Sequence, residues 1–316
     1  MKALTLCEGR LEVVQRDDPL PGPGEVVVGV RACGINAADL LQRRGLYPAP
    51  PGWTPDVPGL EMAGLVLGIG AGVDASLEGR RVCAIVGGGA QATRCRVPAA
   101  HLIGLPEDVD WVEAGGVAEA VLTAHDALLS QGHLRAGERV LISGAAGGVG
   151  VAAVQIAHSL GAHVVAVTRD DTHHSALADL GASQTITLEQ VQDLSGIDLV
   201  LELLGAAHLE RALGALGPHG RVVVIGVGAG SRASIDLLTL MNRRVVLTGS
   251  TLRSREHDEK AAVTAAAAAW LNEHWPTRDF HMPIAQRFDL AEAEAAYEAF
   301  ARPGKFGKIV LSCDDT

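Results

Sequence analysis

A short glycine-rich turn in the middle of the chain limits the possible folds more than any other feature of the sequence. It joins residues 139–143, an apolar run typical of a buried strand, to residues 148–160, which have the pattern of a helix. The turn approximates Gly-x-Gly-x-x-Gly, with Ala145 in the first position and Gly147 and Gly150 in the other two. In that pattern Gly147 lets the backbone approach a pyrophosphate, Gly150 lets the helix pack closely, and the helix N-terminus offers free N–H groups. The context predicts a dinucleotide site, and the alternative is a tight turn in an α/β fold that binds no ligand.

Strands and helices alternate around this turn, from about residue 112 to residue 249. Several of the predicted helices stop at a glycine, as at Gly161, Gly181 and Gly217. Apolar strands that alternate with helices indicate a parallel sheet with helices on both faces. The predicted strands are 163–168, 185–186, 198–202, 220–226 and 244–249, and the predicted helices are 111–131, 175–180 and 209–216. The alanine-rich residues 261–269 lie beyond this stretch and are predicted to form a helix rather than a linker.

The first 115 or so residues have a different pattern, with short strands, many turns and no long helix. The predicted strands are 26–32, 64–73 and 81–86. A short helix at 37–44 follows Asn36, a candidate N-cap, and the proline-rich residues 47–52 are predicted to form a loop. The three glycines 87–89 are predicted to form a loop without a chemical role. We expect a compact β-barrel-like domain, to which the predicted strand 304–311 is a candidate to return.

The composition excludes several classes of protein. A formal net charge of −11 argues against a nucleic-acid-binding surface, which needs a basic stripe. Five cysteines without a Cys-x-x-Cys pair argue against a disulfide scaffold or a structural zinc lobe. Glu8 interrupts the N-terminal segment before a signal-peptide core forms, and the apolar run 140–157 contains four glycines, unlike a membrane helix. We therefore expect a cytoplasmic protein with no nucleic-acid and no membrane partner.

The end of the second predicted strand of the nucleotide domain indicates which cofactor is bound. Enzymes that use NAD usually place Asp or Glu there to bind the ribose 2′-hydroxyl. In this chain Thr168 is at that position and Arg169 follows, and a guanidinium can bind the 2′-phosphate of NADPH. Asp170 and Asp171 come next, so NADH remains the alternative to NADPH.

Three further motifs occur in order with the glycine turn. They are Ala-Cys-Gly-Ile-Asn-Ala-Ala-Asp at 32–39, Arg-Arg-Gly-Leu-Tyr at 43–47 and Gly-Leu-Glu-Met-Ala-Gly at 59–64. Together with residues 145–150 they resemble the medium-chain dehydrogenase/reductase superfamily, and specifically its zinc-independent quinone oxidoreductases, the group that includes zeta-crystallin. Segments 42–52 and 249–255 are most similar to the p53-inducible quinone oxidoreductase subgroup. The resemblance extends over essentially the whole chain.

The resemblance implies an α/β fold with two domains. A GroES-like β-barrel catalytic domain would comprise residues 1–115 and 288–316. A Rossmann NADPH-binding domain with a doubly wound parallel sheet would comprise residues 116–287. It also implies a homodimer that pairs the edges of two nucleotide-domain sheets, with residues 245–247 as a plausible edge strand.

The resemblance also indicates whether the chain binds a catalytic zinc ion. Zinc-dependent relatives carry a cysteine and a histidine at the positions of Asn36 and Leu60. Leucine cannot bind a metal, and a neutral amide is a poor zinc ligand. Cys33 lies three residues before Asn36 and is predicted to be a core thiol. We therefore expect no catalytic zinc and no other metal site.

The residues that the resemblance assigns to the site come from both domains. Asn36 would bond near the nicotinamide ribose or the substrate, and Tyr47 would border the substrate; either could assist protonation of the reduced oxygen. The alternatives are that Asn36 only caps a helix and that Tyr47 only packs the proline-rich loop. The cofactor-binding residues are predicted to be Thr123, Ala145, Gly147, Gly148, Val149, Gly150, Thr168, Arg169, Ile225, Gly226, Ser250, Thr251, Gly307 and Lys308.

The leading hypothesis for function is an NADPH-dependent quinone oxidoreductase that transfers hydride without zinc. The nearest alternative is an NADPH-dependent reductase of an activated C=C bond in an enone or enoyl thioester. Leu41 stands where some relatives carry a second tyrosine, which predicts a wider or more apolar substrate cleft. An alternative of another class is a non-catalytic NADPH-binding protein, crystallin-like or redox-sensing.

Overall fold

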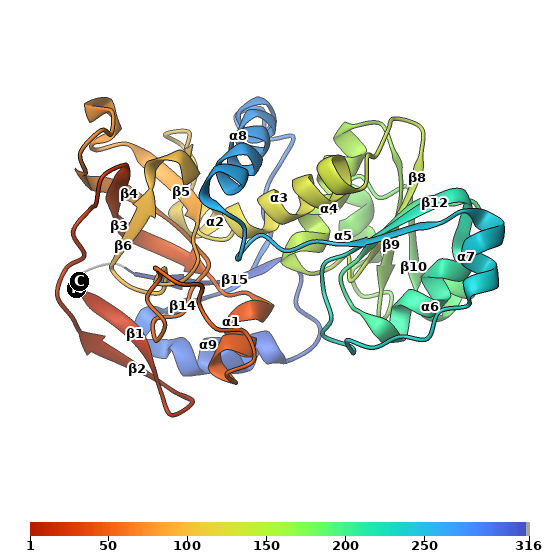
Figure 1. Ribbon diagram of the computed structural model, residues 1–316, viewed down its shortest axis with the longest axis horizontal. Coiled ribbons are helices and arrows are strands. Elements are labelled where there is room, and N and C mark those ends of the chain that lie inside the picture. Colours follow the sequence, from red (N-terminus) through yellow and green to blue (C-terminus); the bar gives the residue numbers. More distant parts are fainter. Residues whose placement is uncertain (314–316) are drawn as a thin grey trace. The chain divides into compact units, whose positions relative to one another are not determined.

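The computed structural model describes residues 1–313, and the chain forms two compact units (Figure 1). Unit 1 comprises Met1–Leu122 together with the chain from Leu252 onward, and unit 2 comprises Thr123–Thr251. The sequence assigns residues 252–287 to the nucleotide domain, whereas in the structure they belong to unit 1. Most of that segment is the alanine-rich helix α8 (His257–His274), and its composition alone does not reveal which sheet it packs on.

Unit 2, drawn mostly in green and cyan in Figure 1, is built on a six-stranded sheet in which all neighbouring strands are parallel. The strands are β8 (Arg139–Ser143), β9 (His163–Thr168), β10 (Gln184–Thr187), β11 (Ile197–Glu202), β12 (Leu216–Val224) and β13 (Val246–Gly249). Their order, β10-β9-β8-β11-β12-β13, reverses between β8 and β11. This order is that of a Rossmann fold, and the predicted doubly wound sheet is confirmed.

The helices of unit 2 connect these strands. They are α4 (Gly148–Ser159), α5 (His174–Asp179), α6 (Ala206–Ala215) and α7 (Leu237–Arg243), with a 3-10 turn at Glu189–Asp193. Gly161 after α4 has φ of +75° and Gly181 after α5 has φ of +103°. Because these left-handed conformations suit glycine, the predicted helix stops at Gly161 and Gly181 are confirmed. The third, Gly217, is the second residue of β12, and α6 ends before it at Ala215.

Unit 1 is built on a seven-stranded sheet of mainly antiparallel pairs with the order β14-β15-β3-β4-β5-β7, in which β6 also pairs with β3. Its strands are β3 (Glu25–Gly34), β4 (Glu61–Ile69), β5 (Arg81–Ile85), β6 (Arg94–Pro98), β7 (Leu102–Gly104), β14 (Ile284–Asp289) and β15 (Lys308–Ser312). A separate antiparallel pair is formed by β1 (Lys2–Cys7) and β2 (Arg10–Gln15). Since β15 pairs with β3, the predicted C-terminal strand does return to the first domain.

The helices of unit 1 are short except for α8. They are α1 (Ala37–Arg43), α2 (Trp111–Ala114), α3 (Ala118–His125, which continues into unit 2) and α9 (Ala293–Ala301), with 3-10 turns at Ala75–Leu77, Ala99–His101 and Leu290–Glu292. Each unit has its own core, around Val28, Ile35 and Met62 in unit 1 and around Leu141 and Val200 in unit 2. Within residues 1–313, no helix has the length and apolar character needed to cross a bilayer.

The single helix predicted over 111–131 is wrong. The structure has α2, a break at residues 115–117, α3, and then a π-helical turn over Asp126–Gln131. A Cβ at Gly115 would lie 2.7 Å from the Cβ of Ala32, and a Cβ at Gly116 would lie 3.1 Å from that of Lys308. The two glycines thus let the break approach β3 and β15 closely, a tertiary constraint that helical spacing does not reveal.

Candidate functional site

The glycine turn lies at the carboxyl end of β8, beside the point where the strand order of unit 2 reverses. Ligands of open parallel sheets bind at this position. Gly144 has φ of +63°, and Gly147 is the N-cap of α4. The first intrahelical bond runs from Val151 N–H to Gly147 O (2.9 Å), so within residues 1–313 the N–H groups of Gly148, Val149 and Gly150 remain for a ligand. The N–H groups of Ala145 and Gly147 already donate to Val167 O and Gly144 O (3.1 Å each).

Gly147 and Gly150 are glycines for different reasons. A Cβ at Gly150 would lie 2.5 Å from the oxygen of Gly144 and 2.6 Å from Cα of Ala145, so close packing of α4 on the turn requires glycine. A Cβ at Gly147 would meet only the oxygen of Gly144, at 3.5 Å, which is an ordinary contact. Nothing in residues 1–313 therefore fills the space beside Gly147, and this half-buried cradle fits the phosphates of a dinucleotide.

The end of β9 carries the residues predicted to distinguish NADPH from NADH. Thr168 is buried; its hydroxyl donates to Asp170 O (2.7 Å) and lies 3.0 Å from Nε2 of His174. The carboxylate of Asp170 accepts the N–H of Thr172 (3.1 Å), and these hydrogen bonds from Thr172 lower the pKa of Asp170. That carboxylate therefore takes part in a local turn, while Arg169 is exposed beside it.

Segments predicted to line the nicotinamide end meet at the carboxyl edge of the unit 2 sheet. Ser250 N–H donates to Val224 O at the end of β12 (3.1 Å), and the hydroxyl of Ser250 donates to the carboxylate of Asp126 (3.2 Å). Asp126 begins the π-helical turn three residues after the buried Thr123. Such π-helical turns are frequent at functional sites. Thr123 and Ser250 thus come from segments in direct contact, and Thr251 follows as the last residue of unit 2.

Gly226 is also fixed by packing within unit 2. The N–H groups of Ile225 and Gly226 donate to the backbone carbonyl oxygen of Glu202 (2.9 and 3.2 Å). A Cβ at Gly226 would lie 2.1 Å from the oxygen of Leu203. Packing alone therefore requires glycine at this position, and its contact with a cofactor stays a prediction.

Sequence reasoning missed the buried carboxylate that connects the ends of β8 and β11. Glu202 accepts hydrogen bonds from the Ser143 hydroxyl (2.9 Å), Leu204 N–H (2.7 Å) and Gly205 N–H (2.8 Å), and it also bonds Nδ1 of His208. Burial raises the pKa of Glu202, but His208 and the N–H groups outweigh burial and hold it below its ordinary value. In the sequence, the one sign of this site is an acidic residue at the end of an apolar strand. Such a residue alone does not show which groups it bonds.

In unit 1, Asn36 belongs to a fully buried polar cluster. Its Nδ2 donates to Oε1 of Glu61 (2.9 Å), and Nζ of Lys308 donates both to Oδ1 of Asn36 (2.6 Å) and to Oε1 of Glu61 (2.5 Å). The other oxygen of Glu61 accepts Glu119 N–H (2.9 Å). The carboxamide is thereby held in one orientation, with its oxygen toward the ammonium, and among residues 1–313 the second N–H of Nδ2 has no acceptor.

Charges around this cluster keep Lys308 protonated. Burial lowers the pKa of Lys308, but the carboxylates of Glu61 and Glu119 outweigh burial and hold it above its ordinary value. The ammonium of Lys308 is bonded to Asn36 and Glu61 inside unit 1, and its predicted contact with the cofactor stays a prediction. Gly307 beside it has φ of +83°, and a Cβ there would lie 1.9 Å from Pro283 O, so packing requires that glycine.

Asp39 fixes the backbone that carries Asn36. Its carboxylate accepts the N–H groups of Asn36 (2.8 Å) and Gly59 (3.0 Å), so the start of α1 is tied to the segment before β4. Burial raises the pKa of Asp39 to about 6, although both N–H groups and the Lys308 ammonium oppose the rise. Asn36 does occupy the predicted N-cap position of α1, and its side chain in addition serves the buried cluster.

Tyr47 lies at the start of the proline-rich loop, which is confirmed as a loop. Its side chain is half-buried, and among residues 1–313 its hydroxyl has no hydrogen-bond partner. Burial raises the pKa of Tyr47, while the nearby guanidinium of Arg253 opposes the rise. The phenol therefore stays protonated at neutral pH and can donate a hydrogen bond.

The donor set around Asn36 is unsuited to zinc. Leu60 is buried and apolar, and Cys33 is a buried thiol that lies 3.6 Å from the sulfur of Cys313. Across residues 1–313, no three His, Cys, Asp or Glu side chains are grouped so that they could hold a metal ion. A lysine ammonium bonded to Asn36 also repels a dication at that place.

The two units correspond to known domain families. The family model described as an alcohol dehydrogenase GroES-like domain matches residues 22–132, and the model described as a zinc-binding dehydrogenase matches residues 148–268. A GroES-like domain followed by a Rossmann sheet defines the architecture of the medium-chain dehydrogenases/reductases. The quinone oxidoreductase of Homo sapiens is 30% identical in an alignment that covers 98% of this chain and 97% of that protein. The chain belongs to the quinone oxidoreductase family of this superfamily.

Two further relatives extend the comparison. The synaptic vesicle membrane protein VAT-1 homolog of Rattus norvegicus is 36% identical over 217 residues, 66% of this chain. This chain spans about half of that relative's length, 54%. The quinone oxidoreductase from Thermus thermophilus, whose structures include a complex with NADPH, superposes with a TM-score of 0.86 and 36% identity over 99% of this chain and 100% of that chain.

Proposed function

We propose that this protein is an NADPH-dependent quinone oxidoreductase that transfers hydride without zinc. The observation that carries the proposal is the cradle beside Gly147, open at the switch point of a Rossmann sheet, in a chain related along its whole length to quinone oxidoreductases. The NADPH complex of the similar Thermus thermophilus protein supports the choice of cofactor. When bound, NADPH supplies the hydride.

In this proposal the glycine turn holds the pyrophosphate with the backbone N–H groups of Gly148, Val149 and Gly150 at the start of α4. Arg169 binds the 2′-phosphate, and the support for this is an exposed guanidinium at the end of β9 where no carboxylate ends the strand. The hydrogen bond between Thr168 and His174 holds the start of this loop in place. Arg169→Gln is expected to weaken NADPH binding about tenfold or more and to leave NADH binding unchanged.

Asn36 and Tyr47 act on the substrate oxygen in the proposed reaction. The remaining N–H of Asn36 donates a hydrogen bond, which is strengthened because the amide oxygen already accepts a bond from an ammonium. The protonated phenol of Tyr47 donates a second hydrogen bond and can pass its proton to the reduced oxygen, directly or through water. A quinone is already electron-poor, so these two donors suffice without a metal.

A homodimer is the proposed assembly. In support, β13 is an edge strand of the unit 2 sheet, and Val246 and Leu247 on it are 58% and 38% exposed. Leu238 and Met241 of α7 are 62% and 72% exposed in the same unit. An unpaired apolar edge strand is a surface on which a second copy of the chain can pair.

One experiment tests the function. The purified protein is titrated with NADPH and NADH, and oxidation of the tighter-binding cofactor is followed with a 1,2-quinone, a 1,4-quinone and an enone, with metal content measured on the same sample. We expect tighter binding of NADPH, faster turnover of a quinone and no stoichiometric zinc. Faster turnover of the enone contradicts the substrate, tighter binding of NADH contradicts the role of Arg169, and binding without turnover indicates a sensor.

A further inference from the structure

Arg253 has a buried guanidinium that joins three separate segments of unit 1. Its Nε donates to Gly87 O (2.8 Å), its Nη1 to Tyr47 O (2.8 Å) and its Nη2 to Oε1 of Gln42 (2.6 Å). The guanidinium carbon also lies 4.9 Å from the centre of the Tyr47 ring. Since Arg253 is only 5% exposed, these bonds form away from water, where charged hydrogen bonds are strong. We call this set of contacts the Arg253 clamp.

The glycine run 87–89, which has no role in the sequence analysis, forms the surface under the clamped loop. A Cβ at Gly87 would lie 2.5 Å from Cδ1 and Nε1 of Trp53, so the indole rests directly on this backbone. Gly89 has φ of +91°, and its N–H donates to Val57 O (2.9 Å). The loop from Tyr47 to Val57 is therefore held by the Gly87 segment as well as by Arg253.

A second cation supports the clamp from α8. Nζ of Lys260 donates to Arg253 O (3.1 Å) and lies 6.0 Å from the centre of the Trp53 ring. Arg253, Lys260 and Trp53 thus connect the start of the returning chain to the Tyr47 loop. The prolines in this loop donate no backbone hydrogen bonds, so side-chain contacts replace part of what a regular loop would supply.

We propose that Arg253 is a positioning residue for the substrate half of the site. By holding the carbonyl and the ring of Tyr47, it sets where the phenol stands and so determines affinity for the quinone, while leaving cofactor binding to unit 2. The proposal rests on the proposed function, because it assigns Tyr47 to the quinone. It adds a residue that does not touch the reacting atoms. Arg253 lies in segment 249–255, and the sequence analysis assigned it no role in the chemistry.

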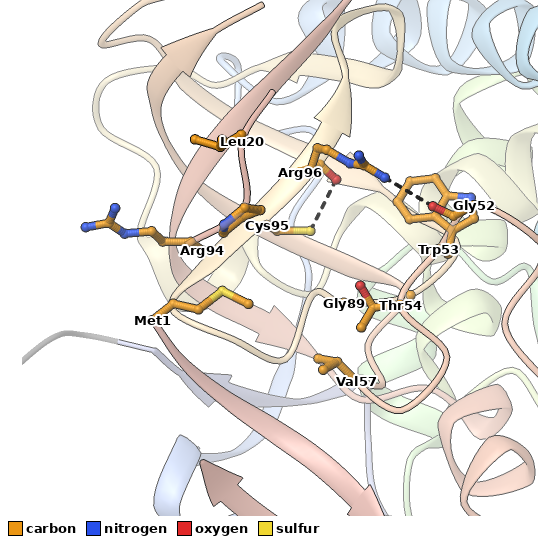
Figure 2. Close-up of a pocket in the computed structure, with 12 residues that line it drawn as sticks. Met1, Leu20, Gly52, Trp53, Thr54, Val57, Gly89, Arg94, Cys95 and Arg96 are labelled. Atoms are coloured by element: carbon orange, nitrogen blue, oxygen red, sulfur yellow. Dashed lines mark hydrogen bonds between the residues drawn. The ribbon is translucent and has the colours of Figure 1, made fainter. Parts of the chain in front are cut away.

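The chain offers a matched control in Arg96. Its Nη2 also donates to a backbone oxygen of the same loop, Gly52 O (3.2 Å; Figure 2), but Arg96 is exposed, whereas Arg253 is buried. Arg96 there borders a cavity of about 160 Å³ whose lining includes Trp53 and Thr54 but neither Asn36 nor Tyr47. Loss of Arg96 therefore removes a cation and a loop contact of similar kind without releasing Tyr47.

The test compares Arg253→Met, Arg253→Lys and Arg96→Met with the wild-type protein. The measurements are the dissociation constant of NADPH by fluorescence, kcat and KM for the fastest quinone, and amide exchange in peptides covering residues 45–58 and 86–92. We expect Arg253→Met to raise the quinone KM about tenfold or more, with a smaller change in kcat and with NADPH affinity within about twofold of wild type. The quinone KM of Arg253→Lys should lie between the values of the wild type and Arg253→Met. Arg96→Met should have the quinone KM and the NADPH affinity of the wild type.

Amide exchange separates this proposal from the proposed function. If the wild type reduces no quinone, the function fails, and faster exchange at Trp53 and Gly89 in Arg253→Met but not in Arg96→Met still supports the clamp. If Arg253→Met changes neither the quinone KM nor the amide exchange, the positioning role of Arg253 is wrong. An equal loss of NADPH and quinone affinity in Arg253→Met also contradicts that role. If Arg253→Met does not fold, Arg253→Lys is judged by the same criteria.

Discussion

The same substitution at two glycines of one turn should have opposite effects on folding and on binding. Gly147→Ala adds a methyl group on the open side of the turn, where the nearest protein atom is 3.5 Å away and φ is −80°. Gly150→Ala adds one 2.5 Å from the Gly144 oxygen, inside the contact between α4 and the turn. We expect the first variant to fold normally and bind NADPH poorly, and the second to be destabilised.

The magnitudes follow from the surroundings of each Cβ. At Gly147, alanine lowers the entropy of the unfolded chain, which raises the free energy of unfolding by about 0.4–1 kcal/mol. Glycine is preferred over alanine at an N-cap, and losing this preference lowers the free energy of unfolding by about the same amount. The free energy of unfolding should therefore change by less than about 1 kcal/mol. At Gly150 the atoms met are backbone, so overpacking costs about 3 kcal/mol and the better helix propensity of alanine returns about 1 kcal/mol, a net loss of about 2 kcal/mol.

Urea unfolding and NADPH fluorescence measure the two effects on the same samples. Gly147→Ala should lose at least about tenfold in NADPH affinity, since the methyl group stands where phosphate oxygens approach the N–H groups. Gly150→Ala should lose about 2 kcal/mol of stability. Wild-type NADPH affinity in Gly147→Ala would refute the assignment of this turn to the pyrophosphate, and unchanged stability in Gly150→Ala would refute the packing argument.

Three further outcomes are expected. Lys308→Met leaves the buried Glu61 carboxylate without its cation and should cost about 3–5 kcal/mol in urea unfolding, part of which Lys308→Met/Glu61→Gln recovers; a loss below about 1 kcal/mol contradicts the buried pair. Burial lowers the pKa of His101 to about 4, so the folded state resists protonation, and stability present above pH 6.5 is lost as pH falls toward 4. The loss approaches about 3 kcal/mol and should shrink in His101→Gln, whereas an equal slope in both proteins excludes His101 as its source. Leu247→Lys on the exposed edge strand should turn a dimer into monomers in sedimentation velocity, and a monomeric wild type contradicts the assembly.

Unit 2 could be read from the sequence because its signals are local. The apolar strands, the glycine turn and the glycines that stop α4 and α5 each lie within a few residues of the feature they determine. The strand order then follows from the rules of alternating strands and helices. The break at Gly115 escaped prediction, because its cause is Ala32 on a distant strand.

The polar clusters of unit 1 could not be predicted for the same reason. Asn36, Glu61 and Lys308 come from three distant parts of the chain and meet only because β15 returns to pair with β3 and β4 lies on the other side of β3. Resemblance pointed to Asn36 and Lys308 one at a time, and it gave no reason to place them in contact. The Arg253 clamp is likewise tertiary, with partners at Gln42 and Gly87.

The buried polar cluster of Asn36, Glu61 and Lys308 also suggests how the proposed reaction proceeds without zinc. A metal ion would polarise the substrate oxygen directly, whereas Lys308 is buried and its Nζ is bonded to Oδ1 of Asn36, so its charge acts through the amide. Asn36 then offers an N–H donor of fixed direction, and the strength of that donor depends on a proton that Glu61 and Glu119 keep on Lys308. A hydrogen-bond donor polarises the substrate oxygen less than a metal ion does. In this account the weaker polarisation is enough to reduce an electron-poor quinone and insufficient to reduce an unactivated ketone. The cluster therefore predicts a substrate range set by the reactivity of the carbonyl, and efficient reduction of a simple aliphatic ketone by the wild-type protein would contradict this account.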